Sequence, residues 1–78
     1  MVLHTPHVPV SASKLFRKRL KELRQEKGWS QEKAAEKCDL SAKVYQFYET
    51  GHKDNPGLKT IEKICAGFGI SVAEFFRE

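Results

Sequence analysis

The stretch Trp29–Gly51 limits the fold of this chain more than any other segment, because it predicts two short helices joined by a tight turn. Ser30 is a good N-cap for the first helix, since its hydroxyl can accept a hydrogen bond from a free backbone N–H. Asp39 can end that helix, because aspartate tolerates the left-handed conformation that a sharp helix stop needs. Ser41 then caps the second helix, which we expect to stop at Gly51.

Apolar residues recur with helical spacing on one side of each of these two helices. They are Ala34, Ala35 and Cys38 on the first helix and Val44, Tyr45 and Tyr48 on the second. Two helices with so few apolar residues cannot form a core alone. The flanking segments must therefore complete it.

Three further helices are predicted around this pair. They run from a cap at Ser11 or Ser13 to about Lys27, from about Leu58 to Phe68, and from Val72 to about Arg77. The first of them places Phe16, Leu20 and Leu23 on one buried face, and the last opens with a capping box of Ser71 and Glu74. No stretch favours a strand. The predicted fold class is all-α, with five helices.

The chain divides into residues 1–13 and residues 14–78. The first segment contains Pro6 and Pro9 and has no helical period, so we interpret it as an extended N-terminal arm. This arm is a loosely attached tail, a strand that pairs with a partner subunit, or an arm that reaches along DNA. His4 and His7 lack the further ligands of a metal site, and we expect no metal or other cofactor.

Composition favours a polyanionic partner, because 78 residues carry a net charge of +4 and a pI near 9.2. Nucleic acid and an acidic lipid surface both fit that charge. Cys38 and Cys65 lie on apolar helix faces, where free thiols fit a reduced cytosolic chain. No run approaches the roughly 18 apolar residues of a membrane span, so we expect a cytoplasmic location.

The start of the first helix is strongly basic. Its cationic residues are Lys14, Arg17, Lys18, Arg19 and Lys21. For most of them the prediction is an ordinary solvated helix face.

Catalysis is not expected. The possible nucleophiles, bases and carboxylates are scattered over separate helices, and no glycine-rich phosphate loop is present. The chain is therefore predicted not to be an enzyme, and no small-molecule ligand is evident.

The outer side of the second helix of the pair has the properties of a DNA-reading surface. A recognition helix presents short or polar side chains to base edges in the major groove. Lys43 can donate to guanine O6 and N7, Gln46 can form paired hydrogen bonds with adenine, and Ala42 or Phe47 can touch a thymine methyl group. Phe47 can instead belong to a protein contact or fold back over Lys43.

With its flanks included, the sequence resembles the Cro and lambda-repressor type helix-turn-helix family, also called the xenobiotic-response-element family. The resemblance spans roughly Leu15 to Phe76. It is carried by Leu20, Leu23, Arg24, Gly28 to Gln31, Ala35, Leu40, Ser41, Tyr45, Tyr48, Glu49, Gly51, Pro56, Ile61, Ile64, Gly69 to Val72 and Phe75.

The resemblance implies roles for individual residues. Positions matching Ala42, Lys43, Gln46 and Phe47 commonly read bases in the family. Gln31 matches a position that grips a phosphate, Arg24 and Glu49 match an ion pair that ties the first helix to the recognition helix, and the further expected phosphate contacts are Ser30, Thr50 and Lys53.

One short helix covers few base pairs, so we expect a homodimer on a two-fold operator. Family members commonly pair through their C-terminal helices. The apolar residues Ile70, Phe75 and Phe76 are predicted to supply that surface, and the alternative for one of the two phenylalanines is that it completes the core.

The sequence thus predicts a sequence-specific, double-stranded DNA-binding transcriptional regulator with a lambda-repressor-like domain. Phage repressors, antitoxins and restriction-modification controllers are the family classes considered, and the controllers resemble this chain best in length and in their Phe-rich final helix. The alternative is a protein-interaction module on the same fold. It is suggested by Phe47 and by the apolar arm residues Val2, Leu3, Val8 and Val10.

Overall fold

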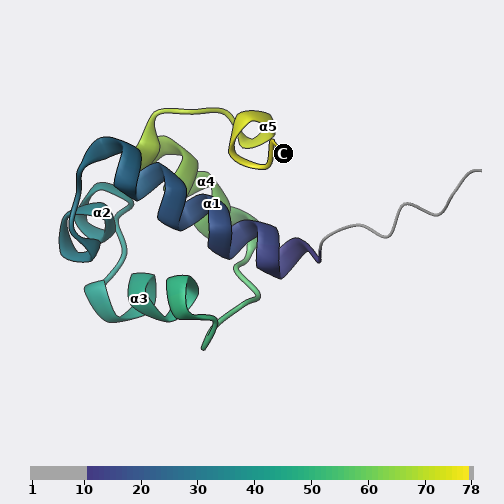
Figure 1. Cartoon of the computed structure of the whole chain (residues 1–78), viewed down its shortest axis with the longest axis horizontal. Coiled ribbons are helices and arrows are strands. Elements are labelled where there is room, and N and C mark those ends of the chain that lie inside the picture. The colour runs from purple at the N-terminus through teal and green to yellow at the C-terminus, as the bar shows by residue number, and fades with distance from the viewer. Residues whose placement is uncertain (1–10, 78) are drawn as a thin grey trace, which may run out of the picture.

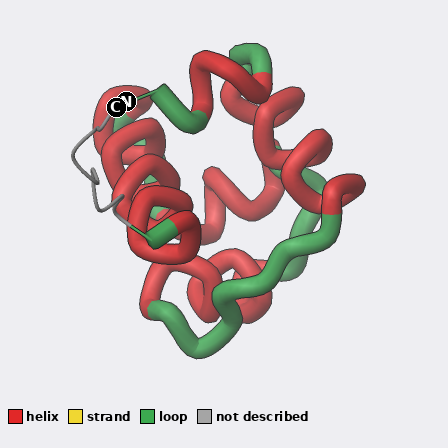
Figure 2. Tube along the Cα trace, turned by 90° about the vertical axis from the view of Figure 1, so that its right-hand side faces the viewer, coloured by secondary structure: helices red, strands yellow, loops and turns green. Residues whose placement is uncertain are grey.

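The computed structural model of the protein describes residues 11–77, which form five α-helices (Figure 1). The helices are α1 (Ala12–Lys27), α2 (Gln31–Lys37), α3 (Ala42–Thr50), α4 (Leu58–Phe68) and α5 (Val72–Phe75). Figure 2 shows helices and loops but no strand in this part of the chain. The predicted all-α class is therefore confirmed.

Helix α1 begins at Ala12, two residues before the expected start of the domain at residue 14. The reason is a cap at Ser11, whose hydroxyl accepts a hydrogen bond of 3.2 Å from the backbone N–H of Lys14. The remainder of the predicted arm, including both of its histidines and its apolar residues, lies outside the described residues.

Serine hydroxyls also cap three of the other helices. Ser30, Ser41 and Ser71 each accept a hydrogen bond of 3.0–3.1 Å from the backbone N–H three residues later. Each such cap stabilises its helix by about 1 kcal/mol. The helix starts predicted at these serines are confirmed.

The turn between α2 and α3 depends on Asp39, the one non-glycine residue of the described range with a positive φ, at 58°. This conformation lets the backbone N–H of Leu40 donate to the carbonyl of Ala35 at 2.9 Å, which ends α2 sharply. Helix α3 therefore begins at once in a new direction. The two helices form the predicted helix-turn-helix.

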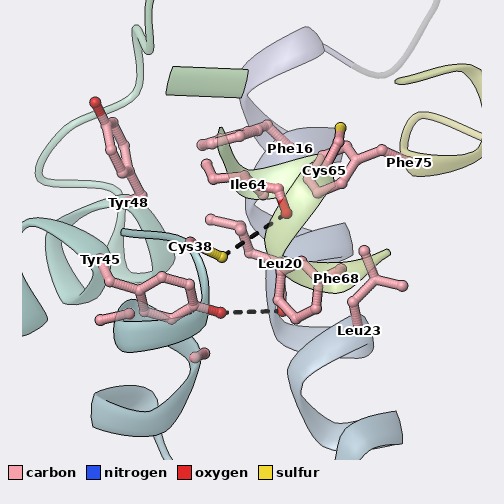
Figure 3. Close-up of a cluster of buried hydrophobic side chains, with 12 residues drawn as sticks. Phe16, Leu20, Leu23, Cys38, Tyr45, Tyr48, Ile64, Cys65, Phe68 and Phe75 are labelled. Carbon is pink, nitrogen blue, oxygen red and sulfur yellow. Dashed lines mark hydrogen bonds between the residues drawn. The ribbon is translucent and has the colours of Figure 1, made fainter. Parts of the chain in front are cut away.

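Helix α1 crosses the middle of the molecule, with α3 on one side and α5 on the other (Figure 1). Its buried residues Phe16, Leu20 and Leu23 meet apolar side chains from all the other helices (Figure 3). The rest of the buried cluster is Ala34, Ala35, Cys38, Tyr45, Tyr48, Ile64, Cys65, Phe68 and Phe75. Both thiols are free, and burial raises the pKa of the Cys38 thiol to about 11.

Two buried contacts fix how the outer helices sit on this core. Tyr45 donates a hydrogen bond of 3.3 Å to the Leu20 carbonyl, which joins α3 to α1. Gly67 brings α4 against the end of α2, because a Cβ at this position would lie 2.6 Å from the Lys37 carbonyl oxygen.

Trp29 lies in the turn between α1 and α2, but its main partner belongs to α4. Its ring stacks on Phe68 with the ring centroids 5.6 Å apart. Trp29 is half-buried, so it covers the edge of the core.

The last helix corrects one expectation about the dimer surface. Phe75 is 0% exposed and packs against Phe16 with ring centroids 5.8 Å apart. It completes the core of one chain and leaves no side-chain surface for a second copy. Phe76 and Ile70 are only half-buried and remain at the surface.

Arg19 holds this last helix against α1. Its Nε donates to the Phe75 carbonyl at 2.5 Å, and its Nη2 donates to the Glu74 carbonyl at 3.0 Å. The prediction of a solvated basic face therefore does not hold for Arg19, whose side chain is 12% exposed. Spacing along α1 gave no signal of this contact, because the acceptors are backbone carbonyls more than fifty residues away.

Candidate nucleic-acid interface

The outer face of α3 carries the four residues predicted to read bases. Ala42, Lys43 and Gln46 are exposed, and Phe47 is half-buried. At helical spacing Lys43 and Phe47 lie opposite to Tyr45, which is fully buried, and Gln46 and then Ala42 follow around the helix. The structure therefore brings the predicted set together on one surface.

Lys43 and His52 both contact the Phe47 ring. The Lys43 ammonium lies over the ring, 5.8 Å from its centroid, so the predicted alternative that these two side chains fold together is confirmed. The His52 ring stacks on Phe47 with centroids 5.4 Å apart and an interplanar angle of 27°. The Thr50 hydroxyl and His52 Nδ1 are 2.9 Å apart, which anchors the histidine.

His52 was not predicted as a site residue. It follows the end of α3, where helical spacing no longer says which side chains are neighbours. The loop folds back because the backbone N–H groups of Gly51 and Lys53 both donate to the Phe47 carbonyl, at 3.0 and 3.1 Å. This turn places His52 beside the recognition face.

The predicted ion pair fixes the far end of α3. Arg24 Nε lies 2.6 Å from one carboxylate oxygen of Glu49, and its Nη2 lies 3.1 Å from the other. Arg24 also donates to the Trp29 carbonyl at 3.0 Å. This two-pronged geometry sets the direction of α3 relative to α1.

The environment of Glu49 keeps it ionised. Its side chain is 1% exposed, and burial alone raises the pKa of a carboxyl group. The hydrogen bonds from Arg24 and Gln31 more than offset this effect, so the pKa of Glu49 lies below its ordinary value.

The predicted phosphate contacts occupy two places beside α3. Gln31 Nε2 donates to Glu49 at 3.0 Å, and its amide has a second hydrogen for another acceptor. The Ser30 hydroxyl accepts the cap bond and keeps its own proton to donate. Thr50, the last residue of α3, and Lys53, which follows the helix, are exposed.

The C-terminal surface contains the remaining predicted contacts. Ile70 and Phe76 are half-buried against the core, and Val72 beside them is 46% exposed. Between residues 11 and 77, no helix is long and apolar enough to cross a lipid bilayer.

Comparison with known proteins identifies the family. The helix-turn-helix family matches residues 20–75. The control protein C.MunI of a Mycoplasma species is 44% identical over 64 residues, which are 81% of this chain and 85% of that protein. The HTH-type transcriptional regulator PuuR of Escherichia coli is 39% identical over 61 residues, which are 78% of this chain and 32% of PuuR.

A phage repressor is also similar to this chain. RstR, the transcriptional repressor of the cryptic phage CTXphi of Vibrio cholerae, is 32% identical over 60 residues, which are 77% of this chain and 53% of RstR. The chain thus spans about a third of PuuR and about half of RstR.

The crystal structure of the hypothetical transcription factor NHTF from Neisseria superposes with a TM-score of 0.79 at 24% identity, over 99% of this chain and 90% of that one. This likeness supports the fold. The geometry of α2 and α3, the bidentate Arg24–Glu49 pair and the family match over residues 20–75 lead to one conclusion: the chain belongs to the Cro and lambda-repressor type helix-turn-helix family.

Proposed function

We propose that this chain is a sequence-specific, double-stranded DNA-binding transcriptional regulator that reads its site with the outer face of α3. The observation that carries the proposal is the exposed row of Ala42, Lys43 and Gln46 on a helix held in place by the Arg24–Glu49 pair. A fixed helix with polar side chains on its free face fits the major groove.

Each residue on this face has a role set by its chemistry. Lys43 donates to guanine O6 and N7, and Gln46 pairs with adenine N6 and N7. Phe47 and Ala42 meet the methyl group of a thymine. Because Phe47 is stacked on His52, its ring is already ordered before DNA arrives.

Phosphate contacts set the position of α3 along the duplex. Ser30 and Gln31 supply donors at the start of α2, and Lys53 supplies one after α3. Thr50, the last residue of α3, contacts phosphate when its hydroxyl exchanges its present hydrogen bond to the Phe47 carbonyl for one to the phosphate. Gln31 donates to Glu49 at 3.0 Å, so both groups lie beside the C-terminal part of the recognition helix. They contact the backbone that flanks the base contacts.

A homodimer on a palindromic operator is the proposed working form. The half-buried residues Ile70 and Phe76, with Val72 next to them, offer an apolar surface for the second copy. A two-fold dimer reads two half-sites, which one recognition helix cannot do alone.

Among the classes expected from the sequence, a control protein is favoured. C.MunI is 44% identical to this chain over the matched residues, against 39% for PuuR and 32% for RstR. Regulation by occupying an operator in the cytoplasm, without a cofactor or small-molecule ligand, follows from this proposal.

A protein partner is the second candidate, and the stacked pair of Phe47 and His52 favours it. An ordered aromatic surface is typical of protein contacts. Salt distinguishes the two functions, because phosphate contacts weaken steeply as salt rises whereas an apolar protein contact changes little.

The test is selection of binding sites from mixed genomic duplex fragments, at two salt concentrations. Wild type is compared with a Lys43→Ala, Gln46→Ala double variant. We expect wild type to enrich one palindromic site and the variant to retain only weak, salt-sensitive binding. A wild-type protein that enriches no sequence overturns the DNA-reading proposal.

A further inference from the structure

An open groove of about 400 Å³ runs along α1 beside the end of α3. Its lining residues are Lys14, Arg17, Lys18, Lys21, Glu22, Gln25 and Glu49. We refer to it as the α1 groove. None of the contacts proposed above uses it, apart from Glu49 at its floor.

The α1 groove is strongly positive. Lys14, Arg17, Lys18 and Lys21 follow one another at helical spacing, so all four line one face of α1. Both carboxylates that line the groove have an arginine partner outside it. Glu22 accepts from Arg19 at 3.0 Å, and Glu49 is held by Arg24.

Three of the four cations have no neutralising partner. Lys18 lies 3.8 Å from Glu22, but Lys14, Arg17 and Lys21 form no ion pair within the part of the chain that the structure describes. A row of unneutralised cations in a groove attracts an anion.

The groove also connects the two proposed sets of phosphate contacts. At one side, Glu49 accepts a hydrogen bond from Gln31 at 3.0 Å. At the other, the Arg17 guanidinium lies against Gly51, since a Cβ built there would be 2.6 Å from Arg17 Nη1. Gly51 directly follows Thr50. A DNA strand held at Gln31 and Thr50 therefore passes the mouth of the groove.

We propose that the α1 groove binds the phosphodiester backbone of duplex DNA that extends past the bases read by α3. Lys14, Arg17 and Lys21 are the phosphate contacts. The row from Lys14 to Lys21 is about 10 Å long, and one strand carries a phosphate about every 3.4 Å along the duplex axis, so the row is long enough for about three successive phosphates. This inference rests on the proposed function. The contacts in the α1 groove add affinity for DNA without sequence preference.

The experiment measures DNA affinity as a function of salt for wild type and for a Lys14→Gln, Arg17→Gln, Lys21→Gln triple variant. The slope of log K against log salt is negative, and each lost phosphate contact reduces its magnitude by about 0.9. Three lost contacts reduce the magnitude by about 2.7. The sequence enriched in a selection stays the same.

A matched control removes the same charge from a different surface. A Lys37→Gln, Lys59→Gln, Lys63→Gln triple variant changes exposed residues at the end of α2 and on α4. It is expected to keep a slope close to that of wild type. A Lys14→Gln, Lys21→Gln double variant leaves the Arg17 contact with Gly51 intact and is expected to lose about 1.8 from the slope.

The length of the duplex gives a second readout. Wild type should bind a duplex extended beyond the enriched site more tightly than one trimmed to that site, and the groove variants should show little gain from the extension. Equal slopes for the groove and control variants, or equal gains from the extension, overturn the inference. A wild-type protein that enriches no site instead overturns the proposed function.

Discussion

Arg24 on α1 and Glu49 near the end of α3 lie 25 positions apart in the chain, yet both oxygens of the Glu49 carboxylate accept hydrogen bonds from the Arg24 guanidinium. Gln31 donates to the same carboxylate from α2. One buried carboxylate thus joins α1 to both helices of the helix-turn-helix. Its loss should affect both stability and the orientation of α3.

We predict that Arg24→Ala lowers the free energy of unfolding by about 3 kcal/mol, because it leaves the buried Glu49 charge without its main partner. Denaturant unfolding of wild type and variant measures this difference. A double variant that also carries Glu49→Gln should recover part of the loss, since no charge then remains unpaired. A loss below about 1 kcal/mol for Arg24→Ala would contradict a buried role for the pair.

Stability should fall in acid through the same carboxylate. The pKa of Glu49 in the folded chain is lower than its ordinary value, which is about 4.3. Between the two pKa values the unfolded chain binds a proton that the folded chain does not bind. The stabilising effect of the ionised Glu49 carboxylate is therefore complete above about pH 4.3 and is lost as pH falls through the pKa of Glu49 in the folded chain. Wild type should therefore be more stable than Glu49→Gln at pH 7, and this advantage should shrink as pH falls below about 4.3. A difference that stays constant as pH is lowered would show that the ionised carboxylate contributes nothing.

Arg19 should contribute more to the free energy of unfolding than its neighbour Lys18 does. Arg19→Ala removes the donors from the Phe75 and Glu74 carbonyls and is expected to cost about 1.5 kcal/mol or more of unfolding free energy. Lys18→Ala, whose ion pair with Glu22 is exposed, should cost less than about 0.5 kcal/mol. Thermal unfolding of the two variants side by side measures the contrast. Equal losses would mean that α5 does not depend on Arg19.

These contacts show where sequence interpretation succeeds. Ser11, Ser30, Ser41 and Ser71 signal helix starts locally, because a cap requires only its own side chain and an N–H three residues later. The Arg24–Glu49 pair was also predicted, because the family resemblance supplied a partner that spacing alone does not give.

Other contacts could not be predicted from the sequence. Arg19 binds backbone carbonyls of α5, and His52 reaches Phe47 through a loop turn. Neither partner follows from a helical period. The burial of Phe75 in place of Phe76 depends on the angle at which a four-residue helix meets α1, which only the packed structure fixes.

His52 should support base reading through Phe47. Replacing one thymine of the enriched site by uracil removes a single methyl group, and we expect this to weaken wild-type binding by about 0.8 kcal/mol at the base pair that meets Phe47. In His52→Ala the same replacement should cost less, because the Phe47 ring has lost the stacked partner that holds it. His52→Phe keeps an aromatic partner and should retain the cost. If all three proteins respond equally to uracil at every thymine, the stacked pair does not read a methyl group.

Substitutions of the two C-terminal phenylalanines should have separate effects, one on folding and the other on dimer formation. Phe75→Ala creates a cavity against Phe16 and is expected to lower the free energy of unfolding of each chain by about 3 kcal/mol or more. Phe76→Ala removes a half-buried ring and should leave the chain folded while it weakens the association of two copies. Circular dichroism follows the first effect, and sedimentation equilibrium follows the second. Because the proposed dimer covers two half-sites, Phe76→Ala should also bind a full palindrome little better than a single half-site. If the Phe76→Ala protein dimerises as strongly as wild type, the dimer surface does not lie at α5.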